Sequence, residues 1–118
     1  MTVTEGAWSV RLTVAAETDF ASIIGWTLEQ FGDVQARLYA QVLSSAVEAL
    51  TTGPNLPGAK VRSEIGKNLF TLHVAREGQR GRHFVLFRVD GAAGRRQIDV
   101  LRILHDAMDL QRHVSEDE

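Results

Sequence analysis

Apolar and polar residues alternate in the first patterned stretch of the chain. Apolar side chains stand at Trp8, Val10, Leu12 and Val14, with small or polar residues between them. A period of two places these four side chains on one face of an extended chain, so the stretch predicts a strand with one buried face. Residues 1–6 carry no such pattern, and we expect them to be frayed.

The next stretch changes to helical spacing. Asp19 has the side chain of an N-cap, and the apolar residues after it predict a helix that ends at Gly32. A second helix is predicted from Asp33 to Gly53, because Pro54 prevents its continuation. Two amphipathic helices joined by one glycine predict an antiparallel hairpin. The expected core positions of the two helices are Phe20, Ile23, Ile24, Leu28, Phe31, Val34, Leu38, Val42, Leu43, Ala46, Val47 and Leu50.

Three strands are predicted after the helices. Residues 69–76 alternate between apolar and polar, whereas residues 83–89 and 98–104 are apolar on both faces and are predicted to be central. Short glycine-bearing turns join them into an antiparallel meander, after a surface loop at 54–68. The pattern therefore gives an α+β fold of order β-α-α-β-β-β, a mainly antiparallel sheet with the helical hairpin packed on one face. Because two helices cover only one face, we expect the other to be partly open or covered by a partner.

Length and composition narrow the class of protein. The 118 residues indicate one domain, 1–118, with a second frayed end at 115–118, and the absence of cysteine suits a reducing compartment. The start of the chain has neither the basic region nor the apolar run of a signal peptide, and no stretch is apolar enough to span a bilayer. Charge is divided, since residues 1–53 carry two basic and six acidic side chains and residues 54–113 carry eleven basic and six acidic ones. The basic half favours an acidic partner, nucleic acid or protein, although a solvated rim of arginines explains it equally well.

Four segments resemble a known family. They are LRILHDAMD at 101–109, the turn at 55–58, LFTLHVAR at 69–76 and GRHFVLFRV at 81–89. Over about residues 7–114 the chain resembles the ParE branch of the RelE/ParE superfamily, the toxin halves of bacterial type II toxin–antitoxin modules. The resemblance implies the same fold, with the first strand lying beside the last.

The resemblance also implies a function. It implies a cytoplasmic toxin, linked to plasmid stabilisation, that stops growth by binding and poisoning DNA gyrase without hydrolytic chemistry, cofactor or metal. A cognate antitoxin would neutralise it in a hetero-oligomer by packing a helix and adding a strand on the open sheet face. DNA would be contacted only through the antitoxin or gyrase. The residues expected to bind partners are Arg76, Arg82, Phe84, Leu86, Arg88, Arg102, His105, Met108, Asp109 and Leu110.

The alternative is an enzyme, a RelE-like ribosome-dependent endoribonuclease. Its phosphate binding and acid–base chemistry would then fall to Arg62, Arg88, Arg102 and His105. Two observations argue against it: the only tyrosine, Tyr39, lies in a predicted helix, and the carboxylates after His105 would repel an RNA phosphate. We therefore expect His105 to be a strand-end residue, hydrogen-bonded to Asp106 or Asp109. A family member that has lost its toxicity is a third reading of the same sequence.

Other polar and aromatic side chains are predicted to be structural. Trp26 lies off the core face of its helix, and we expect it to pack against the second helix rather than bind a ligand. The four histidines lack HxxxH spacing, so no metal site is predicted. The glycines of GQRGR at 78–82 lie in a turn and not at the start of a helix, so no phosphate-binding loop is predicted either.

Overall fold

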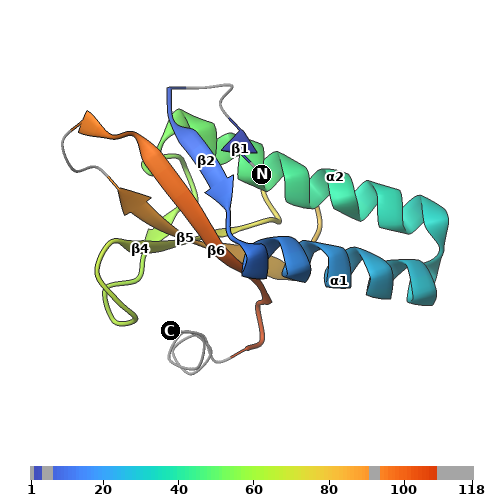
Figure 1. Ribbon diagram of the computed structural model, residues 1–118. Helices are drawn as coiled ribbons and strands as arrows, with labels where there is room; N and C mark the ends of the chain where they lie inside the picture. Colours follow the sequence, from blue (N-terminus) through green and yellow to red (C-terminus); the bar gives the residue numbers. More distant parts are fainter. Residues whose placement is uncertain (1, 4–6, 91–93, 109–118) are drawn as a thin grey trace.

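A single mixed sheet, with two helices on one side, forms the architecture of the chain (Figure 1). The computed structural model describes residues 2–3, 7–90 and 94–108. In chain order its elements are β1 (Thr2–Val3), β2 (Ser9–Leu12), α1 (Val14–Phe31), α2 (Asp33–Ala49), a 3-10 turn (Leu50–Thr52), β3 (Lys60–Val61), β4 (Leu69–His73), β5 (His83–Asp90) and β6 (Gln97–His105). The six strands that these residues form lie in the order β1-β2-β6-β5-β4-β3, with only β2 and β6 parallel. The α+β prediction, with the first long strand beside the last, is confirmed.

The first helix begins earlier than predicted. Thr13, not Asp19, is its N-cap, and the Thr13 hydroxyl accepts a hydrogen bond from the N–H of Ala16 at 3.2 Å. The same hydroxyl lies 3.1 Å from the carbonyl oxygen of Val100 and so ties the start of the helix to β6. Val14, predicted to end the strand, is the first helical residue and is exposed. The chain thus leaves the sheet directly after Leu12, where its pairing with β6 ends.

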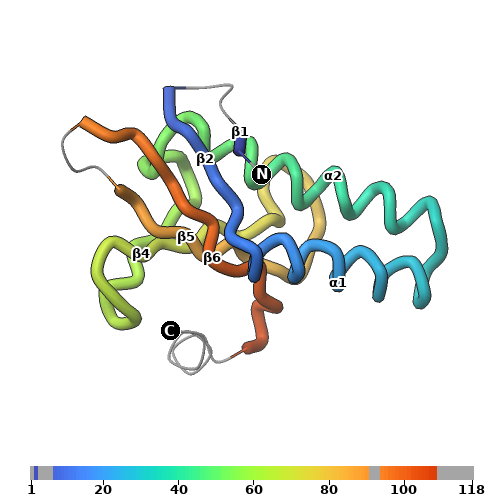
Figure 2. Tube along the Cα trace, viewed as in Figure 1, coloured from blue at the N-terminus to red at the C-terminus, as the bar shows by residue number. Residues whose placement is uncertain are grey.

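The predicted core positions of the helical hairpin are confirmed where the helices lie over the sheet and wrong at the end that lies far from it. Leu43 and Leu50 are fully buried, as predicted. Figures 1 and 2 show that the Gly32 end of the hairpin extends past the sheet. Apolar side chains near that end have no sheet to pack on, and those found exposed against our prediction are Leu28, Phe31, Val34 and Leu38.

The second face of the sheet is more closed than expected. Leu86 packs with Leu69, Ile65 and Leu101 in a small cluster of its own, and only 1% of its surface is exposed. Phe84, another residue expected on an open face, is 8% exposed. The prediction of an open face is therefore wrong at Phe84 and Leu86. Part of this cover is Ile65, which lies in the segment 54–68 that we predicted to be a surface loop.

Two short edge strands were not predicted. Within the loop at 54–68, β3 pairs antiparallel with β4. At the other edge, Thr2–Val3 pairs with β2 in a region where we expected fraying. Residues 115–118, the other end expected to fray, lie outside the described residues. Neither described helix has the length and hydrophobicity of a transmembrane span.

Candidate functional site

A groove of about 1040 Å³ runs between the free end of the helical hairpin and the start of β5. Trp26 and Phe31 line its helical side, with 57% and 64% of their surfaces exposed and their rings in edge contact at 5.8 Å. The remaining lining residues that matter for its chemistry are Tyr39, Arg80, Arg82, His83 and His105. Exposed aromatic rings beside a half-buried polar group are typical of an interaction surface.

Tyr39 and His83 form the polar part of the groove. The Tyr39 hydroxyl accepts a hydrogen bond from the backbone N–H of Arg82 at 3.1 Å and lies 2.7 Å from Nδ1 of His83. The tautomer of His83 sets which of these two groups donates the hydrogen bond between them. Burial, together with the charge of nearby His105, lowers the pKa of His83 to about 4, and burial raises the pKa of Tyr39. Both groups are therefore neutral at pH 7.

Glycine is required where the turn before β5 meets Tyr39. A Cβ added at Gly81 would lie 2.5 Å from Cγ2 of Val74 and 2.9 Å from the Tyr39 hydroxyl. Both distances are below any normal contact. The turn can therefore approach the helix, and donate the Arg82 N–H to Tyr39, only because position 81 has no side chain.

A second network lies at the end of β6. Nδ1 of His73 accepts the N–H of Ala75, so its Nε2 donates to the carboxylate of Asp106 at 2.9 Å. Arg82 reaches the same carboxylate at 3.4 Å. The hydrogen bond from His73 is the main cause of the lowered pKa of Asp106, and the charge of Arg82 adds to it. Asp106 is thus a stable anion that fixes the turn after β6.

His105 does not make a hydrogen bond to Asp106, one of its two predicted partners. Its Nδ1 accepts the N–H of Ala107 at 3.1 Å and lies 3.6 Å from Asp106, whose hydrogen-bonding partner is His73 instead. Asp109, the other predicted partner, lies outside the described residues. The His105 ring stands edge-on to His83, with 5.3 Å between ring centroids. Tyr39 lies in a helix, as predicted, but the fold brings it close to His105 through His83, which contacts both side chains.

The four residues of the nuclease alternative are not brought together. Arg62 and Arg88 both lie opposite Leu69, at one end of β5. His105 pairs with His83 at the other end, five residues and roughly 16 Å away at about 3.3 Å per residue. Arg102 is bound to Asp19 of α1 at 2.7 Å, and this hydrogen bond raises the pKa of its guanidinium. This set forms no single phosphate site.

Comparison with known proteins identifies the family. The family model described as "ParE toxin of type II toxin-antitoxin system, parDE" matches residues 10–110, most of the chain. This chain belongs to the ParE toxin family. Among curated proteins, no sequence matches it.

Solved structures agree with the ParE fold. A chain from the chromosomal ParDE toxin–antitoxin system of P. aeruginosa is 24% identical with a TM-score of 0.65, and the match covers 84% of this chain and 96% of that one. A chain of the toxin–antitoxin complex RelBE2 from Mycobacterium tuberculosis is also 24% identical, with a TM-score of 0.54 and coverage of 88% and 97%. At these identities the likenesses support the fold.

The residues predicted to bind partners lie in several environments of this ParE-family chain. Arg82 and Met108 are exposed near the groove, and His105 lines it. Arg88 is exposed on β5, and Arg76 is one-fifth exposed, with its Nε buried and without a hydrogen-bond partner. Phe84 and Leu86 are buried, and Arg102 is held by Asp19, as described above. Asp109 and Leu110 lie outside the described residues.

Sequence reasoning missed several residues of the groove. Tyr39 and His83 are 44 positions apart, and no local pattern pairs a helix residue with a strand residue. Trp26, predicted to pack inward, lies exposed beside Phe31. One signal was available: Trp26 lies off the core face, and an exposed tryptophan is enriched at binding surfaces.

Proposed function

We propose that this ParE-family toxin stops bacterial growth by binding and poisoning DNA gyrase in the cytoplasm, and that a cognate antitoxin neutralises it. Family membership supports the toxin role, and the toxin–antitoxin systems named for the similar structures support an antitoxin partner. The choice of gyrase rests on the resemblance of the sequence to the ParE branch. DNA is contacted only through these partners.

One observation carries the choice of binding over catalysis. The groove combines exposed aromatic rings with Tyr39 and His83, which are already hydrogen-bonded to each other, and the paired Asp106 lies beside it. His83 is neutral at pH 7, Tyr39 keeps its proton, and Asp106 is held between His73 and Arg82. An acid–base catalyst needs a group whose pKa lies near the working pH. The His83–Tyr39 pair is far from that condition, whereas Trp26 and Phe31 are suited to anchor a protein.

The exposed apolar side chains of the hairpin also suit an antitoxin. Leu28, Phe31, Val34 and Leu38 lie within a short distance along the chain around Gly32 and are all exposed. Such a cluster is normally covered in the cell by a partner. We therefore expect the free chain to be poorly soluble and toxic, and co-expression of an antitoxin to correct both properties.

The deciding experiment measures supercoiling and messenger RNA together. The purified chain should inhibit supercoiling by gyrase, and replacing both Trp26 and Phe31 by alanine should raise the concentration for half-inhibition at least about tenfold, as for central anchors. Val14→Ala is the matched control, since Val14 is exposed on the same helix and does not line the groove. Both variants should keep the melting temperature of the wild type.

The endoribonuclease alternative predicts a different result. Primer extension after induction would then show codon-phased cuts in messenger RNA, and His105→Gln would remove them. Such cuts, with normal gyrase activity, would overturn the proposal. A chain that affects neither process would indicate a family member without toxicity.

A further inference from the structure

The groove at the free end of the hairpin has two walls of different chemistry. On the helical wall, Trp26 and Phe31 present exposed aromatic rings. The second wall is the turn between β4 and β5, which contributes two exposed arginines, Arg80 and Arg82, to the lining. None of the described residues that line the groove is acidic. The groove therefore combines an apolar side with a positively charged side.

The two arginines differ in how far their charge is already neutralised. Arg82 shares the carboxylate of Asp106 with His73, and its Nε lies 3.4 Å from that carboxylate. Arg80 is not among the residues that we predicted to bind partners. Its side chain is exposed and makes no ion pair or hydrogen bond with any other described residue. The positive charge that the groove leaves for a ligand is therefore mainly that of Arg80.

The backbone on both sides of Arg80 is held in place. The N–H of Gln79 donates a hydrogen bond to the carbonyl oxygen of Arg76 at 3.0 Å. The N–H of Arg82 donates to the hydroxyl of Tyr39 on α2 at 3.1 Å. Because these two bonds fix the turn against the helix, a partner that binds Arg80 has little backbone left to order.

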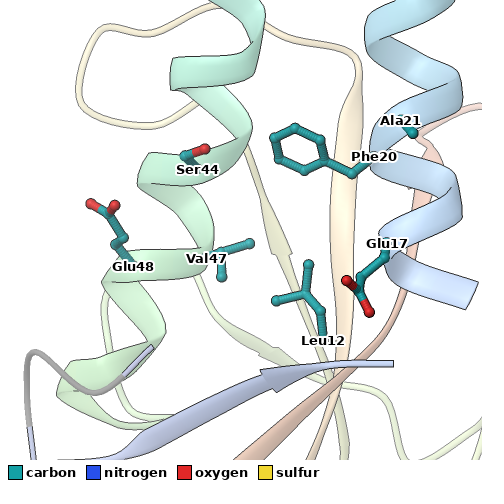
Figure 3. Close-up of a pocket in the computed structure, with 7 residues that line it drawn as sticks. All are labelled: Leu12, Glu17, Phe20, Ala21, Ser44, Val47 and Glu48. Carbon is teal, nitrogen blue, oxygen red and sulfur yellow. The ribbon is translucent and has the colours of Figure 1, made fainter. Parts of the chain in front are cut away.

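A smaller cavity elsewhere in the fold has lining residues of the opposite charge. It measures about 300 Å³ and lies between α1 and α2, beside β2. Figure 3 shows Leu12, Phe20 and Val47 pointing into the space between the two helices. The charged residues of its lining, Glu17 and Glu48, are both acidic, and the Glu48 carboxylate points away from that space. Of these two hollows, only the groove offers a positive side chain to a ligand.

We propose that the surface of DNA gyrase that enters the groove carries a carboxylate beside an apolar side chain. This inference rests on the proposed function and adds the chemistry of the partner. The apolar side chain packs against Trp26 and Phe31, and the carboxylate pairs with Arg80. A nucleic acid strand is disfavoured, because its binding relies on several phosphate contacts, whereas the helices beside the groove, residues 14–49, hold five acidic side chains and one basic one.

The first test needs no gyrase. The full chain is titrated with N-acetyl-phenylalanyl-glutamate amide, and separately with the matching glutamine compound, which has the same shape without the charge. The indole N–H of Trp26 is followed by NMR, and that of Trp8, which does not line the groove, is the internal reference. The acidic probe should shift only Trp26 and bind about two- to fivefold more tightly than the neutral probe, as one solvent-accessible ion pair allows. Equal affinity for the two probes would overturn the proposal.

The second test measures inhibition of gyrase supercoiling by variants at position 80. Arg80→Gln should raise the concentration for half-inhibition about two- to fivefold, and Arg80→Glu should raise it further, because two carboxylates repel each other. Arg80→Lys keeps the charge and should restore most of the inhibition. Arg96→Gln is the matched control, since Arg96 is also exposed but lies just before β6, at the far end of that strand from His105.

The outcomes separate this inference from the proposed function. A wild-type chain that does not inhibit gyrase overturns both. Inhibition by the wild type that Arg80→Gln and Arg80→Glu leave unchanged, with melting temperatures also unchanged, overturns the inference alone.

Discussion

Replacing Asp19 should destabilise the fold more than its place on a helix surface suggests. Its carboxylate lies 2.7 Å and 3.0 Å from two nitrogens of Arg102 and accepts the backbone N–H of Ile103 at 2.9 Å. That N–H lies on the part of β6 that extends beyond its pairing with β2. Asp19 thus binds α1 to β6 and supplies an acceptor where no strand does.

The size of the effect follows from burial. The side chains of Asp19 and Arg102 are only 15% and 22% exposed. Removing one partner of a buried ion pair costs about 3–5 kcal/mol, and partial exposure lowers this range. We therefore expect Asp19→Ala to lower the free energy of unfolding by about 2–4 kcal/mol. Asp19→Asn keeps an acceptor for Ile103 and should cost about half as much.

Urea denaturation at pH 7, followed by circular dichroism, measures these changes. Asp33→Ala is the matched control, because Asp33 pairs with Arg37 one helical turn away and both side chains are largely exposed. It should cost less than about 1 kcal/mol. If Asp19→Ala costs no more than Asp33→Ala, the ion pair is not what joins the helix to the sheet and the reasoning fails.

Three further predictions concern stability. Leu43→Ala should cost roughly 2–5 kcal/mol in the same denaturation assay, because Leu43 is fully buried in the main core, and a loss below 1 kcal/mol would contradict that packing. The pKa of His83 is about 4 in the folded chain, against 6.5 ordinarily, so the unfolded chain binds a proton at His83 more readily. The free energy of unfolding should therefore fall by about 1–2 kcal/mol from pH 6.5 to pH 4, after allowance for the partly exposed ring. His83→Gln should flatten this pH dependence, and an unchanged slope in the variant would rule His83 out as its source. Gly81→Ala should lower the free energy of unfolding by about 1–3 kcal/mol, because the added methyl group would contact Tyr39. Gly25→Ala, with open space around it, should raise the free energy of unfolding by about 0.5–1 kcal/mol. Thermal melts in which both variants behave alike would refute the close approach of the turn at Gly81 to Tyr39.

Local patterns were sufficient for most of the fold. The two-faced apolar runs marked β5 and β6 as central strands, and helical spacing placed Leu43 and Leu50 in the core. The same spacing failed around Gly32 because it says which side chains share a helix face, not how far the sheet extends beneath them. Asp19 was read as a cap for a similar reason. Its true partner, Arg102, is 83 residues away.

The candidate site was less accessible to sequence reasoning. Its hydrogen bonds between side chains join elements far apart in the chain, such as Tyr39 with His83 and His73 with Asp106. The contacts of Tyr39 depend on a close approach at Gly81, which a sequence shows only as a glycine in a turn. Burial then sets the pKa of His83, and burial at that position follows from the packed fold alone.

The parallel pairing of β2 with β6 has a consequence for synthesis of the toxin. The two strands lie about 88 residues apart in the chain, since Val10 pairs with Ile98. The helical hairpin can form early on the ribosome, but the sheet stays in two pieces until β6 is added between β2 and β5. His105, the last residue of β6, is also part of the groove. A message broken before codon 97 therefore yields a chain without its central strand β6, and the cell that translates it is spared a working toxin.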